Sequence, residues 1–152
     1  MPSQPPYASY AALMGVYSGG LATAGLLARL LRRGPQDHTA LDFAVLSAAA
    51  FKAARTLAHD RVSAPMRAPF VEGAADTDDE VPVHTGGLQQ AIGELVTCTR
   101  CVGTWAAAGL ASTQIVAPRF GRLLTWSLGA AAASDFLQAG FTALRGKANE
   151  LD

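Results

Sequence analysis

The chain has 152 residues, a length that suits one domain, and 50% of them are hydrophobic while only 16% are charged. Soluble domains carry roughly 25% charged residues, so this chain is short of the groups that keep a surface hydrated. Its 12 basic residues balance its 12 acidic residues, and the missing basic excess argues against a nucleic-acid partner.

The first regular element is predicted over residues 7–28, which contain no charged side chain. A helix of about 20 apolar residues spans a bilayer, so this segment is the first candidate transmembrane helix. The proline-rich residues 1–6 before it are expected to form a flexible tail. Gly15 and Gly19 have the spacing that lets helix backbones approach closely in lipid. The same spacing also arises from a composition rich in alanine and glycine.

A second helix is predicted over residues 40–59, with Thr39 or Asp42 as its cap. Its first part is apolar, and Lys52 and Arg55 then follow on one face. Two arrangements remain open. The helix either spans the membrane with its basic end reaching the interface, or it lies on the membrane surface as an amphipathic helix.

Two irregular segments are predicted next. Residues 60–70 contain Pro65 and Pro69, and proline disfavours the helical conformation of the residue before it, so an extended strap is expected. Residues 72–85 are acidic and poor in apolar side chains. Such a stretch lacks what a packed core requires and is expected to be a mobile acidic loop.

Two further helices are predicted over residues 88–116 and about 120–144, and the latter carries one acidic residue, Asp135. A soluble four-helix bundle would show charged positions on every helix. The predicted fold is therefore all-α, an integral membrane helical bundle with three to four transmembrane helices. Residues 7–152 would form its single domain.

Asp135 is predicted to face the bundle, because a carboxylate near the middle of a membrane helix costs about 2.5–3.5 kcal/mol on insertion scales. Lys52 and Arg55 are its expected partners. Asp135 then serves either as half of a structural ion pair, as a protonated hydrogen-bond donor, or as the proton-carrying group of a small transporter.

Both cysteines of the chain, Cys98 and Cys101, lie three positions apart and are expected on one side of a helix. They could be half of a zinc site, a redox dithiol, or two small packing residues. Zinc is the cofactor that this pattern suggests, and it would need two more ligands: His59, His84, or the same cysteine pair from a second copy. No pairing of a nucleophile with a base is visible in the sequence, so an enzyme is not expected.

Two stretches carry a distinctive pattern. In residues 55–70 an arginine near a helix end precedes an aspartate and a Pro-Met-Arg-Ala-Pro-Phe run, and residues 94–105 read Glu-Leu-x-x-Cys-x-x-Cys-x-Gly-x-Trp. This pattern resembles a bacterial family of small membrane proteins, domain of unknown function 1360, in which some members are labelled sporulation proteins. The matching residues are Arg55, Asp60, Pro65, Arg67, Pro69, Phe70, Glu94, Leu95, Cys98, Cys101, Gly103 and Trp105.

The resemblance implies a location in the bacterial cell (inner) membrane, with the strap and the cysteine segment meeting at a membrane boundary. There we expect Arg67 to lie against Glu94 and Phe70 to lie near Trp105.

The leading functional hypothesis is a structural or interaction subunit, part of a homo-oligomer or a larger membrane complex. Its expected partners are the lipid bilayer and other membrane proteins, including copies of itself. The alternatives are a metal- or thiol-handling protein that uses Cys98 and Cys101, and a proton-linked transporter that uses Asp135.

Overall fold

A computed structural model describes residues 5–33, 39–73 and 80–149, and the described chain is mainly helical. The predicted all-α class is therefore confirmed. The predicted tail before residue 5 and the centre of the predicted acidic loop, residues 74–79, lie outside the described residues. The elements are α1 (Tyr7–Leu30), α2 (Ala40–His59), η1 (Arg61–Ser63), α3 (Ala64–Arg67), β1 (Val71–Glu72), β2 (Val81–Pro82), α4 (Leu88–Thr97), α5 (Thr99–Val116) and α6 (Pro118–Asn149).

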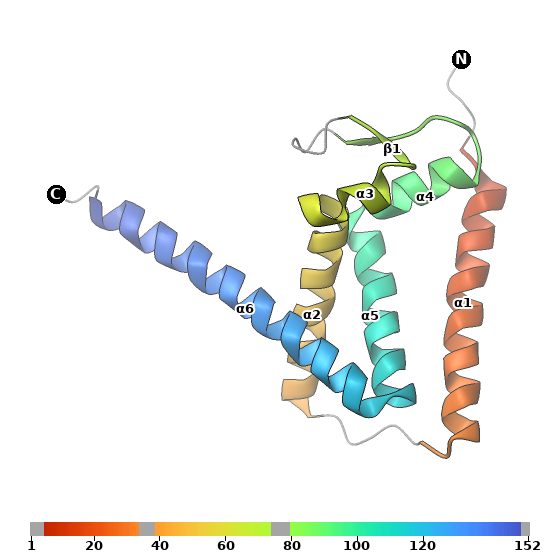
Figure 1. Ribbon diagram of the computed structural model, residues 1–152, viewed down its shortest axis with the longest axis horizontal. Helices are drawn as coiled ribbons and strands as arrows, with labels where there is room; N and C mark the ends of the chain where they lie inside the picture. The colour runs from red at the N-terminus through yellow and green to blue at the C-terminus, as the bar shows by residue number, and fades with distance from the viewer. Residues whose placement is uncertain (1–4, 34–38, 74–79, 150–152) are drawn as a thin grey trace.

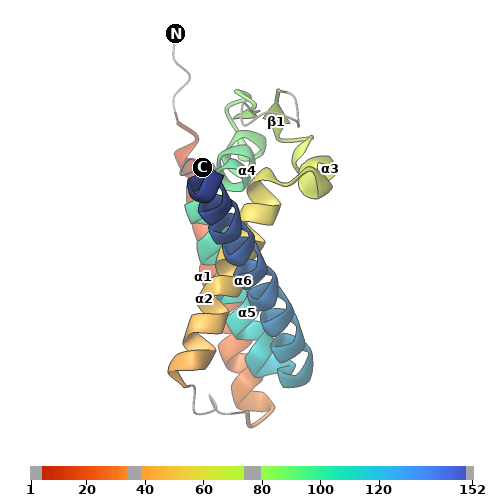
Figure 2. The ribbon, with the colours of Figure 1, turned by 90° about the vertical axis from the view of Figure 1, so that its left-hand side faces the viewer.

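The helices form a bundle that is closed at one end by short elements. Helix α5 packs against α1, α2 and α6, and α2 also packs against α6. Helices α3 and α4 and the β1–β2 ribbon gather at one end of this bundle, as Figures 1 and 2 show from two directions. We call this end the cap, and it holds most of the predicted site residues.

Helix α2 begins and ends where the sequence predicts. The Thr39 hydroxyl accepts a hydrogen bond from the backbone N–H of Asp42, and the Asp42 carboxylate accepts one from the backbone N–H of Thr39. This reciprocal capping box satisfies two N–H groups that have no partner within the helix. The 40–59 prediction is confirmed to the residue.

The predicted single helix over residues 88–116 is wrong, because the chain bends at Cys98. That residue has φ −94° and ψ 99°, outside the helical region, and it separates α4 from α5. The bend turns α4 across the end of the bundle (Figure 1). Its position makes Cys98 the residue that caps α5 rather than a residue inside a helix.

The predicted extended strap over residues 60–70 is also wrong, since η1 and α3 make it helical. Pro65 lies in the first turn of α3, where a backbone N–H has no intrahelical partner and its loss therefore costs little. The ends of the predicted 72–85 loop are ordered as well. Val71 pairs with Pro82 and Glu72 with Val81 in a short antiparallel ribbon.

The core between α2, α5 and α6 is built from small residues. Ala49 and Ala50 of α2 and Leu110 of α5 are its buried members. Gly121 of α6 lies so close to the end of α5 that a Cβ atom there would come within 2.5 Å of the backbone nitrogen of Gln114. The lack of a side chain at Gly121 thus lets the backbones of α5 and α6 approach closely.

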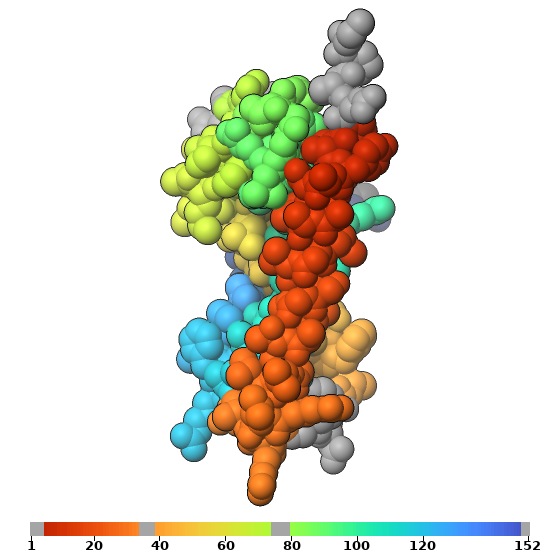
Figure 3. Space-filling model, turned by 90° about the vertical axis from the view of Figure 1, so that its right-hand side faces the viewer, coloured from red at the N-terminus to blue at the C-terminus, as the bar shows by residue number. Residues whose placement is uncertain are grey.

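Large apolar side chains lie on the outside instead. Helix α1 runs along the surface of the molecule (Figure 3), and Met14 and Leu30 on it are 63% and 70% exposed. Helix α6 projects beyond the bundle (Figure 1), and every described residue from Ala133 onward is exposed. Among the described residues, α1 alone is long and apolar enough to cross a membrane.

Candidate functional site

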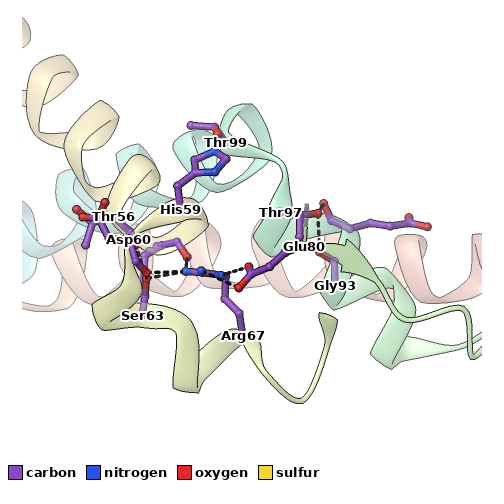
Figure 4. A network of polar contacts seen from close by, with 11 residues as sticks. Thr56, His59, Asp60, Ser63, Arg67, Glu80, Gly93, Thr97 and Thr99 are labelled. Atoms are coloured by element: carbon purple, nitrogen blue, oxygen red, sulfur yellow. Dashed lines mark hydrogen bonds and ion pairs between the residues drawn. The ribbon is translucent and has the colours of Figure 1, made fainter. Parts of the chain in front are cut away.

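Arg67 lies at the centre of the cap and is almost completely buried, with a side chain that is 3% exposed. Its Nε and Nη2 atoms donate to the two carboxylate oxygens of Glu80 at 2.7 and 3.1 Å. Its Nη1 atom donates to the carbonyl oxygens of Leu57 and Asp60 and to the hydroxyl of Ser63, at 2.9, 3.1 and 2.8 Å (Figure 4). All three guanidinium nitrogens therefore have partners. We call this set of contacts the Arg67 network.

The Arg67 network holds the end of α2 to the start of β2. The carbonyl of Leu57 lies in the last turn of α2, where carbonyl groups lack intrahelical partners, and Arg67 supplies one. The Ser63 hydroxyl adds a hydrogen bond to the Asp60 carbonyl at 2.9 Å. Asp60 thus acts through its backbone, as the residue that ends α2.

The predicted pairing of Arg67 with Glu94 is wrong, because Arg67 pairs with Glu80. The turn formed by η1 and α3 directs Arg67 back beneath the end of α2, and the ribbon places Glu80 beside it. Glu94 instead accepts a hydrogen bond from the Tyr10 hydroxyl and one from Gln90 Nε2, the latter at 2.9 Å. These hydrogen bonds, the Tyr10 one foremost, hold the pKa of Glu94 below its ordinary value. Glu94 therefore joins α4 to α1.

The proximity of Phe70 and Trp105 stays a prediction, and each residue makes other contacts that position its segment. The Phe70 carbonyl accepts the N–H of Val83 at 3.1 Å and lies directly against Gly93 of α4, where no side chain would fit. Trp105 of α5 contacts Tyr17 of α1 edge to face, with ring centroids 5.2 Å apart. Phe70 thus positions the ribbon on α4, and Trp105 positions α1 on α5.

Cys98 and Cys101 meet at the N-terminus of α5. The backbone N–H of Cys101 donates to the Cys98 sulfur at 3.3 Å, so a sulfur atom occupies the capping position usually held by oxygen. Hydrogen bonding by the Cys101 thiol lowers the pKa of Cys98, helped by the backbone N–H groups of Cys101 and Arg100. Beside them, His59 Nε2 lies 2.9 Å from the Thr99 hydroxyl. Cys98 is partly buried, and Cys101 is exposed.

A cavity of about 350 Å³ opens beside the cysteine pair, between α1, α4 and α5. Its walls are mainly aromatic and aliphatic, with one carboxylate and one thiol among them. The lining residues are Tyr10, Leu13, Met14, Tyr17, Ala91, Glu94, Leu95, Cys101, Thr104 and Trp105. We call this space the aromatic cavity.

A zinc site built on Cys98 and Cys101 remains a prediction. Within residues 5–33, 39–73 and 80–149, no group of three or more histidine, cysteine or carboxylate side chains gathers to hold a metal ion.

Asp135 lies away from the cap and pairs with Lys52, as the sequence predicts. Lys52 Nζ is 2.7 Å from an Asp135 carboxylate oxygen, and the two side chains are 23% and 55% exposed. Arg55, the other expected partner, is exposed on α2. The geometry is that of an ion pair on the side of the α2–α6 contact.

The sequence does not predict several residues of the site, among them Tyr10, Tyr17, Glu80 and Gln90. Gln90 and Glu94 are four apart on one helix, a spacing that predicts their contact. Glu80 falls within the mobile acidic loop predicted over residues 72–85, because its neighbours in sequence are acidic. The contacts of Tyr10 and Tyr17 with residues of α4 and α5 join segments far apart in sequence, and no local pattern predicts them.

Comparison with known proteins places most of this arrangement within one family. The pattern of the family described as "Protein of unknown function (DUF1360)" matches residues 45–141, which include the Arg67 network, the cysteine pair and the Lys52–Asp135 pair. The chain is also 35% identical over 85 residues to "Sporulation protein YjcA" of Bacillus subtilis (strain 168), covering 52% of this chain and 72% of that one. No solved structure matches the chain. The match over residues 45–141 shows that the chain belongs to the DUF1360 family.

Proposed function

We propose that this chain is a small integral membrane protein with a structural or interaction role, a subunit that packs against copies of itself or against other membrane proteins. The observation that carries the proposal is the large apolar surface that the fold leaves uncovered. Phe136, Leu137, Phe141 and Leu144 on α6 are each more than 60% exposed, as are Met14, Val16 and Leu30 on α1. Exposed apolar area of this extent marks a membrane or protein contact.

The helix lengths allow a bundle of three to four spans, whereas among the described residues α1 alone is also apolar enough to cross a membrane. At about 1.5 Å per residue, α5 with 18 residues and α2 with 20 reach about 27 and 30 Å. The hydrocarbon core of a bilayer is about 30 Å thick. Helix α1, with 24 residues, exceeds that thickness, and the cap at the end of the bundle holds the buried charged network. In this proposal the bundle lies in the inner membrane of a bacterium and the cap lies at its surface.

The small residues of α1 support a further helix as partner. Gly15, Gly19 and Gly20 have open space where a side chain would be, so no part of the described chain uses their close-approach surface. In lipid such positions favour helix association. We propose that a helix of a second copy, or of another membrane protein, packs there.

The transporter hypothesis has less support from the geometry. Asp135 is paired with Lys52 and more than half exposed, so it is held as a surface ion pair and not as a buried carboxylate facing a pathway.

Membrane position is tested with single-cysteine variants in a Cys98→Ser/Cys101→Ser background. A cysteine at Val16, in the middle of α1, should resist a membrane-impermeant maleimide in intact vesicles. A cysteine at Thr85, in the cap, should react on one side of the membrane. Equal labelling of both positions, or release of the protein by carbonate at high pH, would remove the proposal.

Association is tested in the same background by oxidative crosslinking. Gly19→Cys should give a covalent dimer if a second copy packs on α1, whereas Gly140→Cys on the exposed end of α6 serves as the matched control. Replacing Gly15 and Gly19 by leucine should reduce association with any helix partner. A monomer that co-purifies with no membrane protein, and that these replacements leave unchanged, would contradict the interaction role.

A further inference from the structure

We propose that Cys98 and Cys101 form a redox-active dithiol, and that its electron acceptor is a quinone bound in the aromatic cavity. This activity goes beyond the structural role proposed above and does not depend on it. The inference combines two features that adjoin at the N-terminus of α5: a pair of interacting thiols and an apolar cavity with one of these thiols in its wall.

The thiols are arranged for intramolecular disulfide formation. Cys98 ends the bend between α4 and α5, and Cys101 lies one turn later with its N–H on the Cys98 sulfur. The positive end of the α5 dipole and the donated hydrogen bonds stabilise a thiolate at Cys98. Arg100, between the two cysteines, adds a positive charge near the Cys98 sulfur. A thiolate beside a second thiol is the reactant pair from which a disulfide forms.

The aromatic cavity has the size and chemistry of a small-molecule site. Its volume of about 350 Å³ lies in the range of ligand pockets, which are mostly apolar with a few placed polar groups. Tyr17 and Trp105 supply flat aromatic walls, and Leu13 and Met14 supply aliphatic ones. A planar, apolar ring matches this lining, whereas a polar peptide would leave its backbone groups without partners.

The polar atoms of the aromatic cavity favour the reduced form of such a ligand. The Glu94 carboxylate is an acceptor, and the hydroxyl groups of Tyr10 and Thr104 already donate to Glu94 and to the Arg100 carbonyl. Their oxygen atoms can still accept hydrogen bonds. A hydroquinone brings two O–H donors and a quinone brings none, so this wall stabilises the product and draws electrons toward the ring.

The Cys101 thiol donates a hydrogen bond to the Cys98 thiolate, and the Cys101 sulfur also lines the aromatic cavity. As this sulfur adds to a ring carbon of the quinone, its proton passes to the Cys98 thiolate, and one quinone oxygen takes up the proton that Cys98 had released to solvent. Cys98 then gives its proton to the second quinone oxygen as its sulfur attacks the Cys101 sulfur. The S–S bond forms, the carbon–sulfur bond breaks, and its electron pair leaves with the ring. Two electrons and two protons pass from the dithiol to the quinone, giving one disulfide and one hydroquinone.

The experiment uses the full-length protein, reduced and freed of excess reductant, in mild detergent without oxygen. A short-chain ubiquinone is added in one arm and oxidised glutathione in another. We expect the quinone to oxidise the pair, with one hydroquinone formed for every two thiols lost. Cys98→Ser and Cys101→Ser should each lower the rate of quinone reduction at least tenfold. Circular dichroism and elution volume confirm that each variant remains folded.

Occupancy of the aromatic cavity is tested separately. Leu13→Trp fills the cavity and should slow quinone reduction at least tenfold while leaving reaction of the thiols with oxidised glutathione unchanged. Leu26→Trp, on the exposed side of the same helix, should change neither rate.

Quinone reduction that is equal in wild type and both serine variants would overturn the proposal. It would also fail if glutathione disulfide oxidised the pair and the quinone did not, which would identify a thiol–disulfide exchange protein with a different acceptor. A quinone that binds without loss of thiols would likewise exclude the redox role. None of these outcomes bears on membrane insertion or association, so failure here is distinguishable from failure of the proposed function.

Discussion

The Arg67–Glu80 pair is predicted to be the strongest single electrostatic contribution to the stability of the cap, and Glu80→Gln is the most direct perturbation. The substitution keeps the shape of the side chain and removes its charge. It leaves the Arg67 guanidinium, which is 3% exposed, without a countercharge. Removing one partner of a buried pair typically costs about 3–5 kcal/mol. Because Nη1 keeps its three oxygen acceptors and Glu80 is 11% exposed, we expect about 3 kcal/mol for Glu80→Gln.

Arg67→Met should cost more than Glu80→Gln. It leaves the Glu80 carboxylate without a countercharge and also removes the hydrogen bonds that Arg67 Nη1 donates to the carbonyl oxygens of Leu57 and Asp60. Each net hydrogen bond of this kind contributes about 1 kcal/mol, so the expected loss is about 4–5 kcal/mol. The double variant should lose less than the sum of the two single variants by about 2–3 kcal/mol, which measures the coupling between the side chains.

The assay is denaturant-induced unfolding in mild detergent, followed by circular dichroism, with the Lys52–Asp135 pair as the matched control. That pair has the same 2.7 Å separation, but its side chains are 23% and 55% exposed. Exposed ion pairs contribute little to stability, so Asp135→Asn should lower the free energy of unfolding much less than Glu80→Gln does. A loss for Glu80→Gln no larger than that for Asp135→Asn, or no coupling between Arg67 and Glu80, would refute the assignment.

Three further predictions concern other parts of the fold. Gly121→Ala places a Cβ within 2.5 Å of backbone atoms of α5 and should cost about 1–3 kcal/mol of unfolding free energy, whereas Gly140→Ala on the same helix meets no atom within 4 Å and should be neutral or stabilising by up to about 1 kcal/mol. The Cys101 thiol and N–H lower the pKa of Cys98, so the rate at which iodoacetamide alkylates Cys98 should begin to rise at lower pH than for an ordinary cysteine. Cys101→Ala should move this pH–rate profile to higher pH, and superimposable profiles of wild type and variant would contradict the reasoning. The pKa of Glu94 is lowered from 4.5 in the folded state, so its contribution to stability is present above that pH and is lost as pH falls through the folded value; Glu94→Gln should remove this part of the acid dependence of unfolding.

Local patterns predict the parts of this fold that depend on neighbouring residues. The capping box at Thr39 is read from a spacing of three residues, and the boundaries of α2 follow from it. The Lys52–Asp135 pair follows from the cost of an unpaired carboxylate in a long apolar helix, because few basic residues of the predicted helices could pair with that carboxylate. Both inferences need only helix geometry and the sign of a charge.

The errors share a different cause, which is tertiary structure overriding a local preference. Cys98 interrupts an apolar run that reads as one helix, because α4 must turn across the bundle end to cover it. Glu80 belongs to an acidic stretch that lacks core residues, yet a single buried arginine fixes it. In each case the contact that fixes the structure is made with a residue more than ten positions away or with a whole neighbouring element. The composition of the local segment carries no information about such a contact.

The Arg67 network and the aromatic cavity are built from different parts of the chain, and this separates their roles. The Arg67 network is made entirely by residues inside the 45–141 match, between the end of α2 and the start of β2. The aromatic cavity needs α1, which lies before that match and supplies Tyr10, Leu13, Met14 and Tyr17 to its wall. The cysteine pair is positioned by the α4–α5 bend, and Cys101 shares the wall of the cavity with residues of α1. A chain with the matched region alone would keep the network and the bend but would open the cavity to its surroundings. The apolar cavity in whose wall Cys101 lies is therefore a property that α1 adds to the matched region.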